Sequence, residues 1–223
     1  MQKIGRPKLF PSPLSARRDG LLAVGGTLAP EWLLDAYRHG IFPWPIDDVL
    51  AWWSPDPRAI LEFDALYVPR RLARTIKSNR FEVTWNQDFA GVIEGCATAQ
   101  DRADHMWLTP EMRTAYIRLH RLGYAHSVEC WHEGELAGGT YGVAVGGVFS
   151  AESMFYRVRD ASKVALVSLV RRLVDRGFQL LDIQQLNPNT ARHGATEIPR
   201  GEFLRRVAAA RDLDVTFVDG DAV

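Results

Sequence analysis

The chain has 223 residues, of which 47% are hydrophobic and 24% are charged, and its 27 basic side chains balance 27 acidic ones. This composition is typical of globular proteins and excludes a disordered or fibrous chain. The zero net charge means that a nucleic-acid partner would have to bind a local basic patch rather than the overall field of the protein. The length allows one large domain or two modest ones, and we expect two.

Cysteine use and hydropathy indicate the compartment. Cys96 and Cys130 have no spacing typical of a zinc or redox pair, so we expect reduced, structural thiols. The N-terminus lacks the apolar core of a signal peptide, and no run of roughly 18 or more apolar residues occurs. We therefore expect a cytoplasmic protein with no membrane association.

The first 62 residues are rich in Pro, Gly and Trp, and only one helix is predicted there, over "PEWLLDAYRHG". Pro30 suits the first turn of that helix and Gly40 its end. From residue 63 the elements become longer and more regular. We therefore predict a small N-terminal domain over residues 1–62 and a second domain over residues 63–223.

The second domain is predicted to contain both helices and strands. Helices are expected over "PRRLARTIKSN", from Asn86 or Gln87 to about Cys96, from a Thr109 cap to Gly123, over "ASKVALVSLVRRLVDRG" and over "GEFLRRVAAARDL". Strands are expected over "FEVTWN", "HSVECW", "LAGGTYGVAV", "VFSAESMF", the start of "FQLLDIQQLN", and "VTFV". The second, third and fourth of these strands are expected to form an antiparallel meander with turns at "HEGE" and "GG". The fold class is therefore α+β.

The strand "FQLLDIQQLN" changes from apolar to polar where a buried strand would continue with Val or Ile. Alternation places Asp182 and Gln184 on one face, about 6 to 7 Å apart along the strand. A solvated strand end explains this pattern as well as a polar site does, so both readings stay open on spacing alone.

No P-loop, dinucleotide-binding glycine pattern, metal-ligand set or activated nucleophile is present, so we expect no metal and no cofactor. His126 and His193 are each candidate bases, although a lone His is more often packed or exposed. The order of meander, helix and strand is similar to that of acyl-coenzyme A N-acetyltransferases. The stretch "RVRDASK" nevertheless lacks the glycine that a pyrophosphate cradle requires, which favours a different acyl donor.

The helix over "VPRRLARTIKSNR" has no acidic residue and predicts a basic stripe that could face phosphates. A solvated basic face is the alternative. Its cations are Arg70, Arg71, Arg74, Lys77 and Arg80. Trp44 and Trp107 are the tryptophans least explained by packing periodicity, and such rings can stack on unpaired bases.

Several long motifs resemble those of the bacterial leucyl/phenylalanyl-tRNA protein transferases, in the order of that family. They are "GLLAVGGTLAPEWLLDAYRHGIFPW", "WWSPDPRAIL", "GGTYGVA", "SAESMF", "ASKVAL" and "LDIQQLNPNTARHGATEIPR". The resemblance, from about Phe10 to Leu204, implies a small N-terminal domain packed on an acetyltransferase-like domain with a mixed sheet. It also implies transfer of Leu or Phe, less readily Met, from aminoacyl-tRNA to a protein N-terminal Arg or Lys, which marks the protein for N-degron degradation.

The resemblance also implies the roles of individual residues. Asp182 and Gln184 match the catalytic pair, with Asp182 orienting Gln184, and Glu152 matches the active-site acid. Trp44 and Trp107 match residues that contact the terminal adenosine. The remaining substrate-binding positions are Tyr116, Phe149, Met154, Leu169 and Leu181.

Three positions depart from residues familiar in the family, namely Thr140, Leu169 and Ala151, and these bear on the preference among Leu, Phe and Met. We expect a monomer. A tRNA-dependent peptide ligase of cell-wall type and a non-catalytic RNA-binding module are the alternatives. The route of the transferred proton is left open by the sequence.

Overall fold

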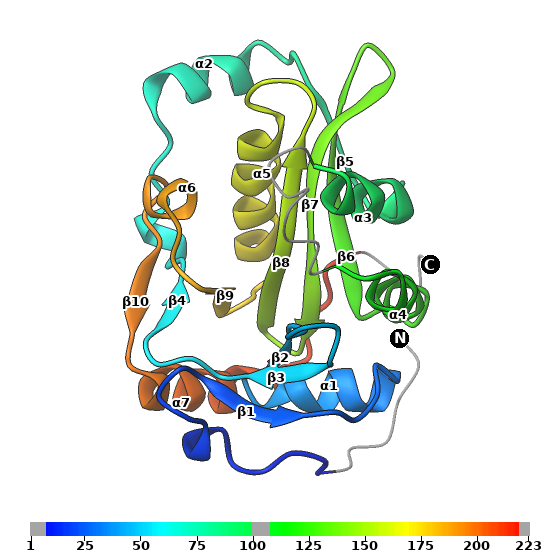
Figure 1. Ribbon diagram of the computed structural model, residues 1–223. Coiled ribbons are helices and arrows are strands. Elements are labelled where there is room, and N and C mark those ends of the chain that lie inside the picture. Colours follow the sequence, from blue (N-terminus) through cyan, green and yellow to red (C-terminus); the bar gives the residue numbers. More distant parts are fainter. Residues whose placement is uncertain (1–7, 100–107, 219–223) are drawn as a thin grey trace.

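The computed structural model describes residues 8–99 and 108–218. Its centre is a seven-stranded sheet in which β8 and β9 are parallel and every other neighbouring pair is antiparallel (Figure 1). In sheet order the strands are β10 (Thr196–Ile198), β4 (Arg58–Ile60), β9 (Leu180–Gln184), β8 (Val148–Tyr156), β7 (Glu135–Val145), β6 (Ala125–His132) and β5 (Glu82–Trp85). The predicted α+β class with a mixed sheet is confirmed.

Helices cover both faces of the large sheet. α5 (Ala161–Asp175) packs on one face against β6 and β7, and α3 (Phe89–Ala97) packs on the other against β7 and β8. α4 (Pro110–Arg121) lies beside α3 over β6 (Figure 1). Apolar side chains from each face form a separate core cluster, so the sheet is buried on both sides.

The N-terminal part adds a three-stranded sheet and a helix at one end of the large sheet (Figure 1). Its elements are β1 (Leu21–Val24), α1 (Pro30–Arg38), β2 (Phe42–Pro43) and β3 (Ala51–Trp53), after the 3-10 helix η1 (Pro13–Ser15). The domain boundary near residue 62 stays a prediction. The structure adds that β4, which precedes this boundary, already pairs with β9 of the large sheet.

The remaining elements connect or close the sheet. They are the 3-10 helix η2 (Phe63–Ala65) and the helices α2 (Arg70–Lys77), α6 (Pro188–Ala191) and α7 (Arg200–Ala210). α2 lies at the end of the molecule opposite α1 and α7 (Figure 1). None of the helices within residues 8–99 and 108–218 has the length and apolar character needed to cross a membrane.

The predicted helices are confirmed, including the Thr109 cap, whose side chain accepts the backbone N–H of Met112. The strand predicted over "VTFV" is wrong. Its backbone carbonyls do not pair with a neighbouring strand. They accept hydrogen bonds from Arg172 of α5 and from Arg176, the residue just after α5.

Candidate active site

Two bulges create a polar site where β8 and β9 part. The parallel pairing between these strands is limited to Val148–Ser150 opposite Leu180–Asp182. Just beyond it, Glu152 has no partner on β7, because Ala151 pairs with Gly142 and Ser153 already pairs with Tyr141. A Cβ on Gly142 would lie 2.3 Å from the backbone oxygen of Ser150, so the strand needs glycine opposite this bulge. Bulges of this kind re-aim a side chain.

The second bulge is on β9. Asp182 pairs with Ile60 and Gln184 pairs with Ala59, which leaves Ile183 without a partner. Gln184 has a left-handed backbone with φ of 66°, a conformation that costs a residue with a Cβ about 1 to 3 kcal/mol. Regular alternation therefore stops before Gln184. The left-handed conformation is held by the Asp182 carboxylate, which accepts the backbone N–H of Gln184 at 2.9 Å.

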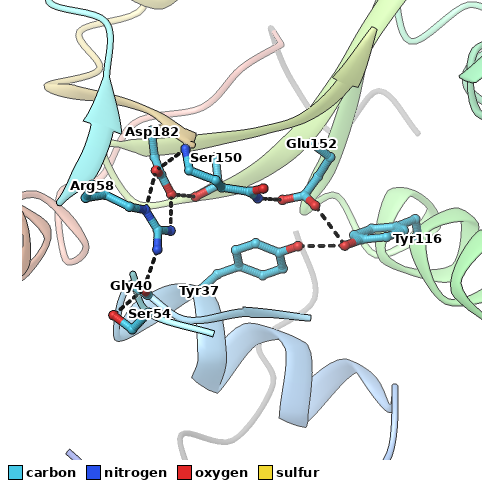
Figure 2. A network of polar contacts seen from close by, with 9 residues as sticks. Tyr37, Gly40, Ser54, Arg58, Tyr116, Ser150, Glu152 and Asp182 are labelled. Atoms are coloured by element: carbon cyan, nitrogen blue, oxygen red, sulfur yellow. Dashed lines mark hydrogen bonds and ion pairs between the residues drawn. The ribbon is translucent and has the colours of Figure 1, made fainter. Parts of the chain in front are cut away.

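Asp182 is buried, with 1% of its surface exposed, and its carboxylate accepts four hydrogen bonds (Figure 2). Arg58 donates two of them, from Nε at 2.8 Å and from Nη2 at 2.7 Å. The hydroxyl of Ser150 donates the third at 3.1 Å, and the backbone of Gln184 the fourth. Because a carboxylate offers about four lone-pair positions, Asp182 has none left for a substrate.

Arg58, at the start of β4, is as buried as its partner. Its third donor, Nη1, reaches the backbone oxygen of Gly40 at 3.2 Å. The guanidinium lies between two rings, 4.7 Å from the centroid of Phe42 and 4.5 Å from that of Phe203. Polar groups and aromatic faces thus enclose the charge on all sides.

The side chain of Gln184 belongs to a second network. Its Nε2 donates to Oε1 of Glu152 at 2.7 Å, and the hydroxyl of Tyr116 donates to Oε2 at 3.0 Å. Tyr116 has one hydroxyl hydrogen, so Tyr37 is the donor of the 2.8 Å contact between the two tyrosine oxygens (Figure 2). Among the described residues none donates to Oε1 of Gln184. The bond from Nε2 to Glu152 therefore holds the amide, and its carbonyl oxygen accepts no hydrogen bond from the described residues.

Glu152 is the titratable group of this network. Burial raises the pKa of its carboxyl to about 7, and the charge of Asp182 acts in the same direction. Tyr37, Tyr116 and Arg58 oppose the rise. The tyrosines stay protonated near neutral pH, because burial raises the pKa of each hydroxyl well above its ordinary value.

The candidate bases on histidine do not join this site. His126 is stacked on Phe217 and contacts Asn86, and burial lowers its pKa to about 3. His193 is also buried, with Nδ1 near the backbone oxygen of Tyr67. Both residues pack within the fold.

Trp44 lines a cavity of about 440 Å³ next to the polar site. The other lining residues are Phe42, Pro45, Ile46, Asp47, Trp53 and Gln185. Trp44 is 39% exposed. Trp107 lies outside the described residues.

The residues expected around the transferred side chain lie together. Phe149, Leu169 and Leu181 are buried in the core cluster between the sheet and α5, and Met154 packs against it. Thr140 on β7 donates its hydroxyl to the backbone oxygen of Ser153, which keeps this polar group satisfied inside the sheet. The five cations of α2 and its C-terminal end are all exposed, although Leu72 of the same helix belongs to this core cluster.

Sequence reasoning missed Arg58 and Tyr37. The only signal for Arg58 was a lone charge at the start of the apolar run "RAIL". Tyr37 gave none, since its spacing on α1 is that of a core residue. The solvated strand end considered for Asp182 and Gln184 is wrong, because both side chains are buried.

Within the described part of the chain no group of three or more His, Cys, Asp or Glu side chains could hold a metal ion. The prediction that the reaction needs no metal and no cofactor stays a prediction.

Comparison with known proteins identifies the family. The family model for leucyl/phenylalanyl-tRNA protein transferase matches residues 60–208, and the model for its N-terminal domain matches residues 26–56. A leucyl/phenylalanyl-tRNA protein transferase of Nitratidesulfovibrio vulgaris is 56% identical over 199 residues, 88% of this chain and 85% of the relative. One from Solidesulfovibrio magneticus is 53% identical over 206 residues, 92% of this chain and 83% of the relative.

Among solved structures, a GCN5-related N-acetyltransferase from Kribbella flavida aligns with a TM-score of 0.39 and 15% identity, over 77% of this chain and 61% of that one. Similarity at this level does not identify a shared activity. The family model covers more than half of the chain, and the two relatives align with most of it. The chain belongs to the leucyl/phenylalanyl-tRNA protein transferase family and is a tRNA-dependent aminoacyltransferase.

Proposed function

We propose that the site around Gln184 joins Leu or Phe, and less readily Met, to the α-amine of a protein N-terminal Arg or Lys. The donor is the ester at the 3′ end of aminoacyl-tRNA. The amine nitrogen forms the new C–N bond, the ester C–O bond breaks, and an amine proton is released as the departing ribose oxygen takes one up. The product would be a protein marked for N-degron degradation.

The carbonyl oxygen of Gln184, which accepts no hydrogen bond from the described residues, is the observation that carries this proposal. An ester is already reactive, and an α-amine with an ordinary pKa of about 7.7 to 8.0 is partly neutral at cell pH, so the enzyme mainly has to align the two. Oε1 of Gln184 accepts an N–H of the amine. The bond from Nε2 to Glu152 fixes the amide and polarises it toward that task.

This geometry changes the role expected for Asp182. Its side chain was expected to orient the amide of Gln184, but the carboxylate that holds this amide is Glu152. Asp182 instead holds the backbone N–H of the same residue. We propose that Asp182 positions the main chain of Gln184 and Glu152 positions its side chain, and that Glu152 also attracts a cationic N-terminal residue.

The tRNA would extend from the site toward α2. We propose that Trp44 and Trp107 contact the terminal adenosine, that Tyr116, Phe149, Met154, Leu169 and Leu181 shape the aminoacyl site, and that the basic cluster of α2 holds the acceptor stem. The aromatic cavity at Trp44 and the exposure of the α2 cations support this arrangement. The enzyme would act as a monomer in the cytoplasm, where charged tRNA is available.

A transfer assay with radiolabelled Leu-tRNA and a peptide that begins with Arg tests the proposal. We expect Gln184→Ala to lower turnover by about 10² or more, as removal of one preorganised transition-state partner does in other enzymes. Binding of Leu-tRNA should change little, because the amide contacts the amine and not the tRNA.

Gln179→Ala is the matched control, since Gln179 is an exposed glutamine just before β9 whose side chain donates to the backbone oxygen of Gly177. It should retain full turnover. Normal turnover of the Gln184 variant would refute the proposed role of the amide. Label in a lipid-linked lysine rather than in the peptide would favour the cell-wall type of ligase.

A further inference from the structure

The buried guanidinium of Arg58 has contacts in addition to its ion pair with Asp182. All three of its nitrogen atoms donate, two to Asp182 and one to the backbone oxygen of Gly40. The rings of Phe42 and Phe203 hold its two faces. We infer that Arg58 is a positioning residue for aminoacyl transfer and acts on Gln184 through Asp182, an inference that rests on the function proposed above.

The first step of the argument is the path from Arg58 to the reacting amide. Arg58 fixes both oxygens of Asp182, and Oδ1 of Asp182 also accepts the backbone N–H of Gln184. That bond supports a left-handed residue that would relax without it. A tilted Asp182 carboxylate would therefore move the main chain of Gln184 and with it the carbonyl oxygen that meets the amine.

The second step is the link to the N-terminal elements. Gly40 follows α1, and Phe42 of β2 both flanks the guanidinium and lines the cavity at Trp44. Ser54, after β3, donates to the same Gly40 oxygen at 3.3 Å (Figure 2). One side chain thus joins the wall of the cavity to the strand that carries Gln184. If the cavity binds the terminal adenosine, Arg58 fixes the position of the aminoacyl ester relative to the amide of Gln184.

Substitution of Arg58 by lysine tests whether the positive charge or the planar shape of the guanidinium is required. Arg58→Lys keeps the positive charge but replaces a planar fork by a single ammonium, which cannot bind both oxygens of Asp182 and the Gly40 carbonyl in this arrangement. Misalignment of reacting groups lowers the rate of the chemical step. We expect kcat to fall about tenfold or more, with the KM values for Leu-tRNA and for the Arg peptide within about twofold of wild type.

Arg206→Lys is the matched control, because Arg206 also forms a forked ion pair, with Glu62 and Glu202, but on the partly exposed surface of α7. Its kcat should stay at the wild-type value. Thermal melting of Arg58→Lys and Arg206→Lys checks that both variants are folded. A kcat of Arg58→Lys within twofold of wild type would overturn the inference.

A double-mutant cycle gives a readout that a merely structural role would not produce. If Arg58 acts through Gln184, Arg58→Lys should lower kcat no further once Gln184→Ala is present. Losses that multiply in the double variant would overturn the inference. If Gln184→Ala alone is fully active, the proposed function and this inference both fail; if it is impaired while Arg58→Lys is not, only the inference fails.

If Arg58→Lys does not fold, a second variant tests the inference. The variant R58M/D182N removes both charges of the buried pair, which avoids an unpaired ion. Because Asp182 itself supports Gln184, this variant is compared with Asp182→Asn alone. A kcat well below that of Asp182→Asn supports the inference, and a kcat equal to that of Asp182→Asn overturns it.

Discussion

The basic helix α2 and the start of β4 use arginine in opposite ways. Arg70, Arg71 and Arg74 of α2 are exposed at one end of the molecule, while Arg58 is 1% exposed beneath the active site. An exposed cation remains hydrated and available to a charged partner, but contributes little to the fold. A buried cation is committed to its partners, because removal of one of them leaves an uncompensated charge. The comparison distinguishes exposed arginines, which can bind a charged partner, from a buried arginine, which positions other residues.

The largest effect should come from the buried pair. We expect Asp182→Ala to lower the free energy of unfolding by about 3 to 5 kcal/mol, because the buried Arg58 loses the carboxylate with which it is paired. Turnover should fall by about 10² or more, since Gln184 loses its backbone support. Urea denaturation and the transfer assay measure the two losses.

The exposed counterpart for this test is Arg74→Ala, which should change the free energy of unfolding by no more than about 0.5 kcal/mol. Similar losses of stability in both variants would remove the distinction between the two regions.

The second effect concerns tRNA affinity. We expect reversal of Arg70, Arg74 and Lys77 to Glu to weaken binding of Leu-tRNA, most strongly at low salt. Each lost phosphate contact should reduce the slope of log K against log salt by roughly 0.7 to 0.9. Filter binding at several salt concentrations gives the slope.

Binding of an aminoacyl-adenosine should survive this triple reversal, because that small donor needs only the cavity at Trp44 and the aminoacyl site. tRNAs with different bodies that carry Leu should lose affinity alike, since the contacts are to the backbone. An unchanged affinity and slope in the folded variant would mean that α2 is a solvated basic face.

The smallest effect should be on the pH profile. The pKa of Glu152 is about 7, and its ionised form is the one that accepts the amide of Gln184 and the hydroxyl of Tyr116. Protonation of Glu152 should therefore lower turnover about twofold at pH 7 and about tenfold per unit well below it, in addition to the loss from protonation of the substrate amine. In Glu152→Gln this acid limb should disappear, leaving only the titration of the substrate amine. An identical limb in both proteins would assign the pKa to another group.

The sequence predicted the regular elements well because their signals are local. The periodicity of α5, the Thr109 cap and the alternation in the meander each depend on a few neighbouring residues. The strand expected over "VTFV" does not form, because its carbonyls accept hydrogen bonds from Arg172 of α5 and from Arg176 just after it, both distant in sequence.

The site could be predicted only in part. Asp182 and Gln184 stood out as polar residues in an apolar strand, but the bulges that separate their roles arise from pairing with β4 and β7. Arg58 is 124 residues from Asp182 in the chain, and no local pattern joins them. Long-range register, rather than residue type, decides which carboxylate holds the amide.

The raised pKa of Glu152 makes folding a proton-uptake reaction. Between its ordinary value of 4.5 and about 7, the folded chain retains a proton that the unfolded chain has released. Stability from this group is fully present below pH 4.5 and is lost as the pH rises through 7, by up to about 3 kcal/mol. The ionised Glu152 that accepts the amide of Gln184 is thus formed only where this contribution to stability has been lost.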